Sequence, residues 1–191
     1  MIKPFSYYIT AIILYQMLQL NSAGSIPSCP VAVQNNPSGK RQLLNGRIWY
    51  DQHSKVEGDQ YFLSDSFLKG SVVFNGQKYD GLDLKYDLLN DELVLRPESH
   101  PIIYLNKEMV DSFTLYFDRV HKVINTGNNT PGILQGYVNV LYDGPSGLYV
   151  KYSKRIYPLA VDGKYDLFVQ FRQIYLRKDS ALVPVGGKRK L

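Results

Sequence analysis

The segment VVFNGQKYDGLDLKYDLLNDELVL, residues 72–95, constrains the fold more than any other part of the chain. The pair Asn75-Gly76 lies between two short apolar or aromatic runs. Asn-Gly is the favoured pair for a two-residue hairpin turn because both positions need a positive φ. After this turn, apolar and charged residues alternate with period two, which is typical of a strand with one buried face and one solvated face. The segment therefore predicts antiparallel hairpins.

The alternation assigns the side chains of this strand to two faces. We expect the apolar set (Leu82, Leu84, Tyr86 and Leu88) in the core and the charged set (Asp83, Lys85 and Asp87) in solvent. Two carboxylates four residues apart on a strand lie roughly 13 Å apart, which is too far for the acid and base of a glycosidase. We therefore interpret the charges as a solvated face and not as a catalytic site.

The same pattern of strands and turns continues downstream. PIIYL reads as a strand, NKEMV as a single helical turn capped by Asn106, and DSFTLYF as another strand. A hairpin is expected around DGPSG, and YDLFVQFRQIYLRK is its next partner. The 16 Tyr and eight Phe favour strands as well. We expect an all-β fold: an antiparallel meander of hairpins that forms a curved sheet or a partly closed barrel, with at most one or two short helical turns besides the N-terminal leader.

The N-terminus has the pattern of a secretory leader. One lysine precedes an apolar run over residues 7–20, and small residues follow at positions 22–24. The alternative, a membrane anchor, would need about 20 apolar residues and a following cluster of positive charge. We expect a signal peptide over residues 1–24, a flexible lead-in rich in Pro, Ser, Asn and Gly over residues 25–44, and a single β domain over residues 45–191.

Motifs for catalysis, metals and cofactors are absent from the sequence. His53, His100 and His121 do not begin a metal-ligand spacing, and DGPSG lacks the order of a nucleophile elbow. The only cysteine, Cys29, has no internal disulfide partner and lacks the motif for lipid attachment. The formal net charge of +5 is modest and its carriers are scattered. We expect no enzymatic activity, no cofactor, no metal and no nucleic-acid partner.

One row of side chains is a candidate binding surface. Tyr149, Lys151, Arg155 and Tyr157 fall on one face of a predicted strand, with Ser153 between them. Aromatic and cationic side chains can hold an anionic or sugar-like ligand by stacking and charge. The alternative, which we favour, is an outer row whose tyrosines cover the sheet.

A resemblance to other proteins depends on the order of strands and turns and not on a catalytic motif. From Leu63 to the end, the chain resembles a group of uncharacterised exported β-rich envelope proteins of environmental Gram-negative bacteria. Members of this group continue into a Lys-rich helical tail at the point where this chain ends, so the resemblance implies a chain truncated at its C-terminus. It also implies an envelope location without a known activity. The segments that carry the resemblance are FLKGSVVFNGQKYDGLDLKYDLLNDELVL, VDSFTLYF, GYVNVLYDGPSGLYVKY and YDLFVQFRQIYLRKDSALVPVGGKRKL.

Two functions are compatible with the leader and the β pattern. The first is an exported, non-enzymatic cell-envelope or secreted β domain, an interaction or structural module that contacts another envelope protein. The alternative is a periplasmic carrier that holds a lipid-like or other apolar ligand in a half-barrel. A cavity lined by apolar side chains would separate the two. For both we expect the mature chain in the periplasm, in the outer envelope or outside the cell, close to a membrane without spanning it.

Overall fold

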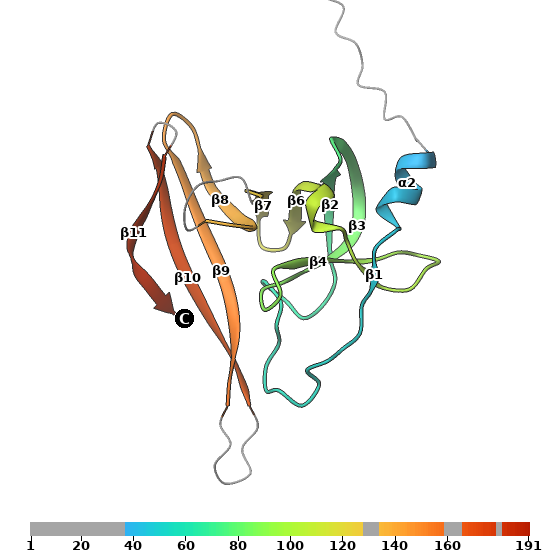
Figure 1. Ribbon diagram of the computed structural model, residues 1–191, viewed down its shortest axis with the longest axis horizontal. Helices are drawn as coiled ribbons and strands as arrows, with labels where there is room; N and C mark the ends of the chain where they lie inside the picture. The colour runs from blue at the N-terminus through green and yellow to red at the C-terminus, as the bar shows by residue number, and fades with distance from the viewer. Residues whose placement is uncertain (1–36, 128–133, 159–165, 179–180) are drawn as a thin grey trace, which may run out of the picture. The chain divides into compact units, whose positions relative to one another are not determined.

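Eleven strands form one sheet in the computed structural model, which describes residues 37–127, 134–158, 166–178 and 181–191 (Figure 1). All of these residues belong to one unit that spans Asn36–Leu191. In chain order the elements are α2 (Pro37–Leu43), β1 (Arg47–Ile48), β2 (Leu68–Phe74), β3 (Gln77–Asp87), β4 (Glu92–Arg96), β5 (Ile103–Tyr104), the 3-10 turn η1 (Lys107–Met109), β6 (Val110–Tyr116), β7 (Val120–Asn125), β8 (Tyr137–Asp143), β9 (Gly147–Tyr157), β10 (Leu167–Lys178) and β11 (Ala181–Lys190).

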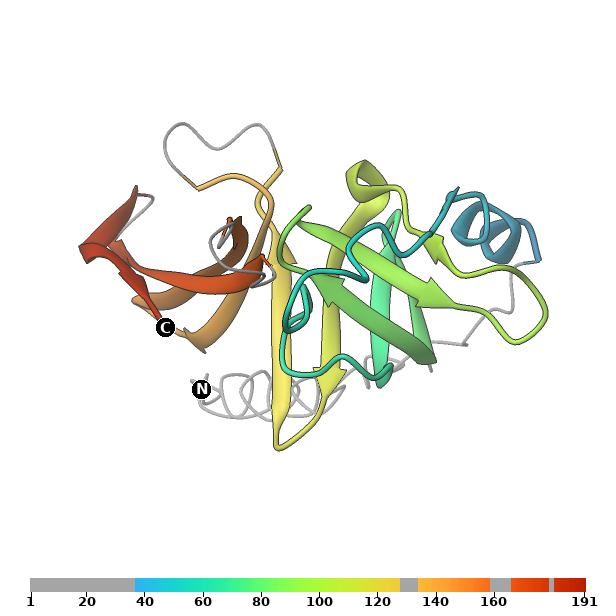
Figure 2. The same cartoon turned by 90° about the horizontal axis from the view of Figure 1, so that it is seen from below.

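The strand order is that of two meanders joined edge to edge. The order is β1-β5-β4-β3-β2-β6-β7-β8-β9-β10-β11, and the ladders between these neighbours are antiparallel. Consecutive strands pair with each other from β2 to β5 and again from β6 to β11, β1 pairs with β5, and the two sets meet where β2 pairs with β6 (Figure 2). The predicted all-β fold with an antiparallel meander is therefore confirmed.

The sheet is curved and does not close into a barrel. In the described part of the chain, β1 and β11 lie at its two ends and no ladder joins them. Register shifts interrupt four of the ladders, and such irregularities bend strands and increase their twist. The backbone N–H of Lys154 on β9 donates a hydrogen bond to the carbonyl of Leu88, just after β3, at 3.0 Å. Of the two predicted forms, the curved sheet is the one observed.

The long connection between β1 and β2 attaches to strands that are far apart in the strand order. The N–H of Phe62 donates to the carbonyl of Tyr86 on β3 at 2.8 Å. The N–H of Phe168 on β10 donates to the carbonyl of Glu57 at 3.1 Å. Gln60 of this connection donates a hydrogen bond to Asp87 on β3, and the ring of Tyr61 lies against the ammonium of Lys85, so the connection covers part of the β3 face on which the charged residues lie.

The buried apolar side chains form two clusters. The larger cluster lies among β2 to β7 and includes Phe74, Leu84 and Phe113. The smaller cluster lies between β8, β9 and β10, and its buried members are Leu134, Val138, Tyr149 and Tyr175. Burial of such side chains is the main favourable contribution to folding, at roughly 25 cal/mol per Å² of apolar surface.

Two local sequence predictions are confirmed. Asn75 and Gly76 both have a positive φ, of 51° and 74°, as the two-residue turn between β2 and β3 requires. The side-chain oxygen of Asn106 accepts a hydrogen bond from the N–H of Glu108 and caps the single helical turn η1. Both features are encoded by residues that are close together in the chain, and the turn gains a further contact because the N–H of Gly76 donates to the carboxylate of Asp111 on β6 at 2.8 Å.

The predicted flexible lead-in over residues 25–44 is wrong at its C-terminal end. Residues Pro37–Leu43 form α2, and Leu43 is buried in the larger cluster. A Cβ atom on Gly39 would overlap the hydroxyl of Tyr79 on β3, so the helix packs closely on that strand. A seven-residue helix has too little apolar periodicity to be recognised in a sequence, and tertiary contacts supply its stability.

The remaining N-terminal predictions, a signal peptide over residues 1–24 and a lead-in over residues 25–36, lie outside the described residues, as does Cys29. None of the described helices is long and apolar enough to cross a membrane.

Strand β11 was not predicted from the sequence. It comprises Ala181–Lys190 and pairs with β10. This stretch lacks a clear alternation of apolar and polar residues, because it contains Pro184 and the pair Gly186-Gly187. Pro and Gly are typical of turns, so the sequence does not indicate a strand here. The strand lies at the end of the sheet, where a proline is tolerated.

Candidate functional site

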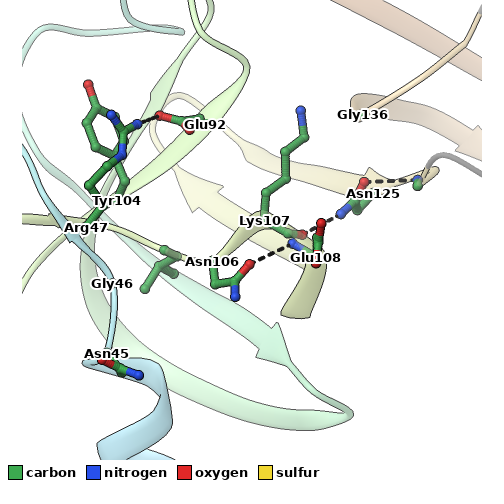
Figure 3. A pocket seen from close by; sticks show the side chains of 12 residues that line it. Asn45, Gly46, Arg47, Glu92, Tyr104, Asn106, Lys107, Glu108, Asn125 and Gly136 are labelled. Atoms are coloured by element: carbon green, nitrogen blue, oxygen red, sulfur yellow. Dashed lines mark hydrogen bonds and ion pairs between the residues drawn. The ribbon is translucent and has the colours of Figure 1, made fainter.

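A hollow of about 700 Å³ opens on the side of the sheet that carries β1, β5 and η1 (Figure 3). Its lining comes from four regions: the connection from α2 to β1, the strands β4 and β5, the turn η1, and the ends of β7 and β8. Most of the lining residues are polar or are glycines, and they are Asn45, Gly46, Arg47, Glu92, Tyr104, Leu105, Asn106, Lys107, Glu108, Asn125, Gly127 and Gly136.

One wall of the hollow is an ion pair stacked on a tyrosine. The guanidinium of Arg47 donates to the carboxylate of Glu92 at 2.6 Å and lies over the ring of Tyr104, 4.5 Å from its centroid (Figure 3). Burial and the nearby carboxylates of Asp87 and Glu92 raise the pKa of Tyr104 to about 12. The tyrosine is therefore a neutral hydroxyl at physiological pH.

The opposite wall is built around η1. The amide nitrogen of Asn125 donates to the carbonyls of Lys107 and Val110, at 2.8 and 2.9 Å, so it fixes the turn in place. The side-chain oxygen of Asn106 caps the turn, as predicted. In the described part of the chain, the amide nitrogen of Asn106 and the carboxylate of Glu108 have no hydrogen-bond or ion-pair partner. These two groups are available to a ligand.

Asp91 connects this wall to the interior of the domain. Its carboxylate lies 2.7 Å from the ammonium of Lys107 and 2.8 Å from that of Lys151, and it accepts a hydrogen bond from the hydroxyl of Tyr86 at 2.6 Å. Burial alone would raise the pKa of Asp91, but the two lysines hold it below its ordinary value. A Cβ on Gly136 would overlap this carboxylate, which explains the close approach of a glycine there.

Asp87 belongs to a second polar network, and the prediction that it lies on a solvated face is wrong. Its side chain is 0% exposed, and its oxygens accept hydrogen bonds from the N–H groups of Leu89 and Asn90 and from the amide of Gln60, at 2.8 to 3.0 Å. The oxygen of the Gln60 amide lies 2.9 Å from Nδ1 of His53. The connection between β1 and β2 supplies both of these residues and excludes water from Asp87.

A smaller hollow of about 350 Å³ lies over this network. Its lining includes His53, Lys85 and three aspartates, which are Asp51, Asp59 and Asp65. Within the described ranges, no group of three or more His, Cys, Asp or Glu residues is arranged to hold a metal ion. The ammonium of Lys85 instead lies over the ring of Tyr61, 4.3 Å from its centroid.

The predicted binding row lies entirely on β9, but it is not one exposed surface. Tyr149 is only 4% exposed and packs in the smaller core cluster, and Lys151 forms the ion pair with Asp91. Arg155 and Tyr157 are exposed and lie beside the ring of Phe171 on β10. The expectation of a single exposed row is therefore wrong for Tyr149, whereas a binding role for Arg155 and Tyr157 stays a prediction.

An exposed apolar surface lies on the same strands. In the ladders of β8 to β11, Tyr142 pairs with Leu148, Leu148 with Leu176, and Leu176 with Val183. Directly paired residues of antiparallel strands have their side chains on the same face. We call this row of four side chains (Tyr142, Leu148, Leu176 and Val183) the apolar row. Tyr142 is 56% exposed, Leu176 39% and Val183 49%.

Sequence reasoning missed most of the residues that shape these sites. Asp91 lies in the turn between β3 and β4 and has a positive φ of 57°, so its local sequence is explained by the turn alone. Its lysine partners, Lys107 and Lys151, lie 16 or more positions away in the chain, so no spacing rule connects them with it. The sequences of β8, β9 and β10 show which apolar residues share a face within each strand. The apolar row itself could not be predicted, because it depends on the register between neighbouring strands.

Comparison with protein-family models, with curated proteins and with solved structures found no match. The resemblance to exported envelope proteins stays a prediction from the sequence.

Proposed function

We propose that this chain is an exported, non-enzymatic β domain that acts by binding another protein of the cell envelope through the apolar row. The proposal combines the leader pattern of residues 1–24 with one observation about the folded domain. That observation is the alignment of three exposed apolar side chains (Tyr142, Leu176 and Val183) with the half-buried Leu148 across four neighbouring strands, β8 to β11. Single exposed apolar residues are ordinary on protein surfaces, whereas contiguous ones are typical of interaction sites.

The geometry of the apolar row favours a protein partner over a small apolar ligand. The row lies on the face of a sheet, and its neighbours on the same face, Ile174 and Val185, extend it along the strands. The four side chains of the row line neither of the two hollows, and an apolar surface outside a hollow suits a protein that covers it, because small ligands need a concave site. Both of the hollows described above are lined mainly by polar side chains, so these two hollows lend no support to a carrier of apolar ligands.

Site-specific photo-crosslinking in the native host tests the proposal. A photo-reactive amino acid replaces Leu176, Val183 or, as a control, the exposed Asp80 on β3. We expect a discrete adduct with one envelope protein from positions 176 and 183, and none from position 80. The adduct should be found in the envelope fraction because the proposal requires export.

A second variant separates binding from folding. Leu176→Ser, combined with the photo-reactive residue at position 183, should abolish the adduct because it removes an apolar contact at the centre of the row. The same substitution should change the unfolding free energy by less than about 1 kcal/mol, because the side chain is partly exposed. Equal adducts at positions 80 and 183, an adduct with a second copy of this chain, or an adduct that persists in Leu176→Ser would each contradict the proposal.

A further inference from the structure

We propose that the 700 Å³ hollow between β1, β5 and η1 binds a neutral, hydroxyl-rich ligand, a segment of an oligosaccharide. This inference is independent of the apolar row, which lies on β8 to β11 and does not line the hollow. Binding sites for small molecules are typically 300–1,000 Å³ in volume and hold a few polar groups that fix the orientation of the ligand. The size of the hollow lies within this range.

The balance of charge argues against an anionic ligand. The hollow and the carboxylate of Asp91 behind it contain three cationic side chains and three carboxylates. Arg47 pairs with Glu92, and Lys107 and Lys151 both pair with Asp91. The carboxylate that lacks a partner in the described part of the chain, Glu108, would repel a phosphate or a second carboxylate. The two lysines share the single carboxylate of Asp91, so together with Glu108 these six charges sum to zero and leave no net positive charge to attract an anion.

The groups that remain available match the hydroxyl groups of a sugar. The amide of Asn45, the amide nitrogen of Asn106 and the carboxylate of Glu108 line the hollow, and no hydrogen bond occupies them among the described residues. Amides both donate and accept, and a carboxylate accepts from two donors. Adjacent hydroxyls of a sugar are donors and acceptors at once, so they satisfy such planar groups without bringing a charge.

An extended peptide fits the hollow less well than a sugar. Peptides that bind along a sheet use a row of free backbone groups on an edge strand. The nearest edge strand, β1, comprises only Arg47–Ile48, and its partner β5 comprises only Ile103–Tyr104. The free groups of the hollow belong to side chains, which suits the scattered hydroxyls of an oligosaccharide.

Titration monitored by NMR tests this site directly. The purified, 15N-labelled protein is mixed with neutral gluco- and chito-oligosaccharides, with an oligogalacturonate, with inorganic phosphate and with a neutral polar tripeptide. We expect at least one neutral oligosaccharide to shift the side-chain amide signals of Asn45 and Asn106 and the backbone signal of Gly46 in a saturable manner. Oligogalacturonate, phosphate and the peptide should not do so.

Three variants identify the groups that make the contacts. Asn106→Asp keeps the oxygen that caps Glu108 and removes the donor, and Glu108→Gln removes the free carboxylate. Each should weaken binding by roughly fivefold or more, the size expected for one lost hydrogen bond. Glu98→Gln, at an exposed position outside the hollow, should leave the affinity unchanged.

Three results would overturn the inference. The first is the absence of any shift at these signals with all the neutral oligosaccharides up to about 10 mM, which is a limit for weak binding. The second is tighter binding of oligogalacturonate, phosphate or peptide at the same signals. The third is an unchanged affinity in both Asn106→Asp and Glu108→Gln. None of these results bears on the apolar row, so the two proposals fail separately.

Discussion

Asp83 and Asp87 show how two identical residues on one strand face can have opposite environments. Asp83 is 24% exposed in its side chain and pairs with Lys69 and Arg96 on the neighbouring strands. Asp87 is fully buried and accepts hydrogen bonds from the backbone and from Gln60. Exposed ion pairs contribute little to stability, whereas loss of a buried acceptor leaves its donors without partners.

We therefore expect Asp87→Ala to lower the unfolding free energy by about 3 kcal/mol or more, because it leaves several buried donors unsatisfied. Asp83→Ala, the matched control on the same strand, should lower it by less than about 1 kcal/mol. Urea unfolding midpoints of the two variants measure the difference. A small loss for Asp87→Ala would mean that water reaches this carboxylate and that the network around it is not closed.

The pKa of Asp91 leads to a prediction on acid stability. Because the folded pKa lies below the ordinary value of 3.8, the ionised carboxylate stabilises the fold above that pH. This contribution is lost as the pH falls through the folded pKa. In Lys151→Met, burial would dominate and the pKa of Asp91 would rise, so the loss should begin at a higher pH.

NMR titration of the Asp91 carboxyl group, together with unfolding free energies between about pH 7 and pH 3, measures this effect. Lys122→Met, which removes an exposed lysine that pairs with Asp143, is the control and should leave the pKa of Asp91 unchanged. An identical acid profile for Lys151→Met and the parent protein would show that Lys151 does not hold the charge of Asp91.

At the scale of single elements, β2 depends on close packing in a way that its sequence does not show. Gly70 lies between β3 and β6, where it pairs with Leu82 and with Leu115. A Cβ at this position would overlap the carbonyl oxygen of Thr114 and lie 2.9 Å from a methyl group of Leu84. The backbone of β6 cannot move away without breaking its ladder with β2.

Gly70→Ala should therefore destabilise the domain by roughly 1–3 kcal/mol, the usual effect of overpacking. Gly187→Ala on β11 is the matched control, because a Cβ there would meet open space and the φ of Gly187 is not in the positive region. Thermal unfolding of the two variants gives the comparison. Equal melting temperatures would show that the contact between β2 and β6 is looser than described.

The hairpin turn and the helix α2 differ in how far the sequence predicts them. Asn75-Gly76 encodes its own backbone conformation, so the turn between β2 and β3 could be predicted from two residues. The helix α2 is stabilised by the burial of Leu43 in the larger cluster and by the close packing of Gly39 on Tyr79, which is 40 positions away in the chain. Its local sequence carries only a proline at the start and two basic residues in the last turn.

At the scale of the whole molecule, the joining of the two meanders was not predictable. Strand β2 pairs with β6, and three other strands lie between them in the chain. The hydrophobic pattern predicts that both strands have a buried face, but it does not predict which strand each of them pairs with. The choice depends on how the whole sheet curves, and that curvature arises from twist and from irregular registers.

The leader pattern leads to a prediction about the complete protein in its host. The mature chain should begin close to Ser25 and be found outside the cytoplasm, because the charged start, apolar run and small residues match the requirements for export. Ile13→Arg, in the centre of the apolar run, should block export, whereas Ile13→Leu should not. N-terminal sequencing of the envelope fraction is the measurement, and an intact Met1 in that fraction would contradict the prediction.

The sequence by itself determined those features that depend on neighbouring residues. These are the all-β class, the alternation of β3, the turn at Asn75-Gly76 and the cap at Asn106. Only the tertiary structure decided which polar groups are buried and which side chains of different strands form one surface. Asp87 and Gln60 are 27 positions apart, and Asp91 and Lys107 are 16 apart. Such pairs form because the curved sheet and the connection between β1 and β2 bring them together. Hydrophobic periodicity describes only residues a few positions apart, so it cannot predict contacts between residues so far apart in the chain.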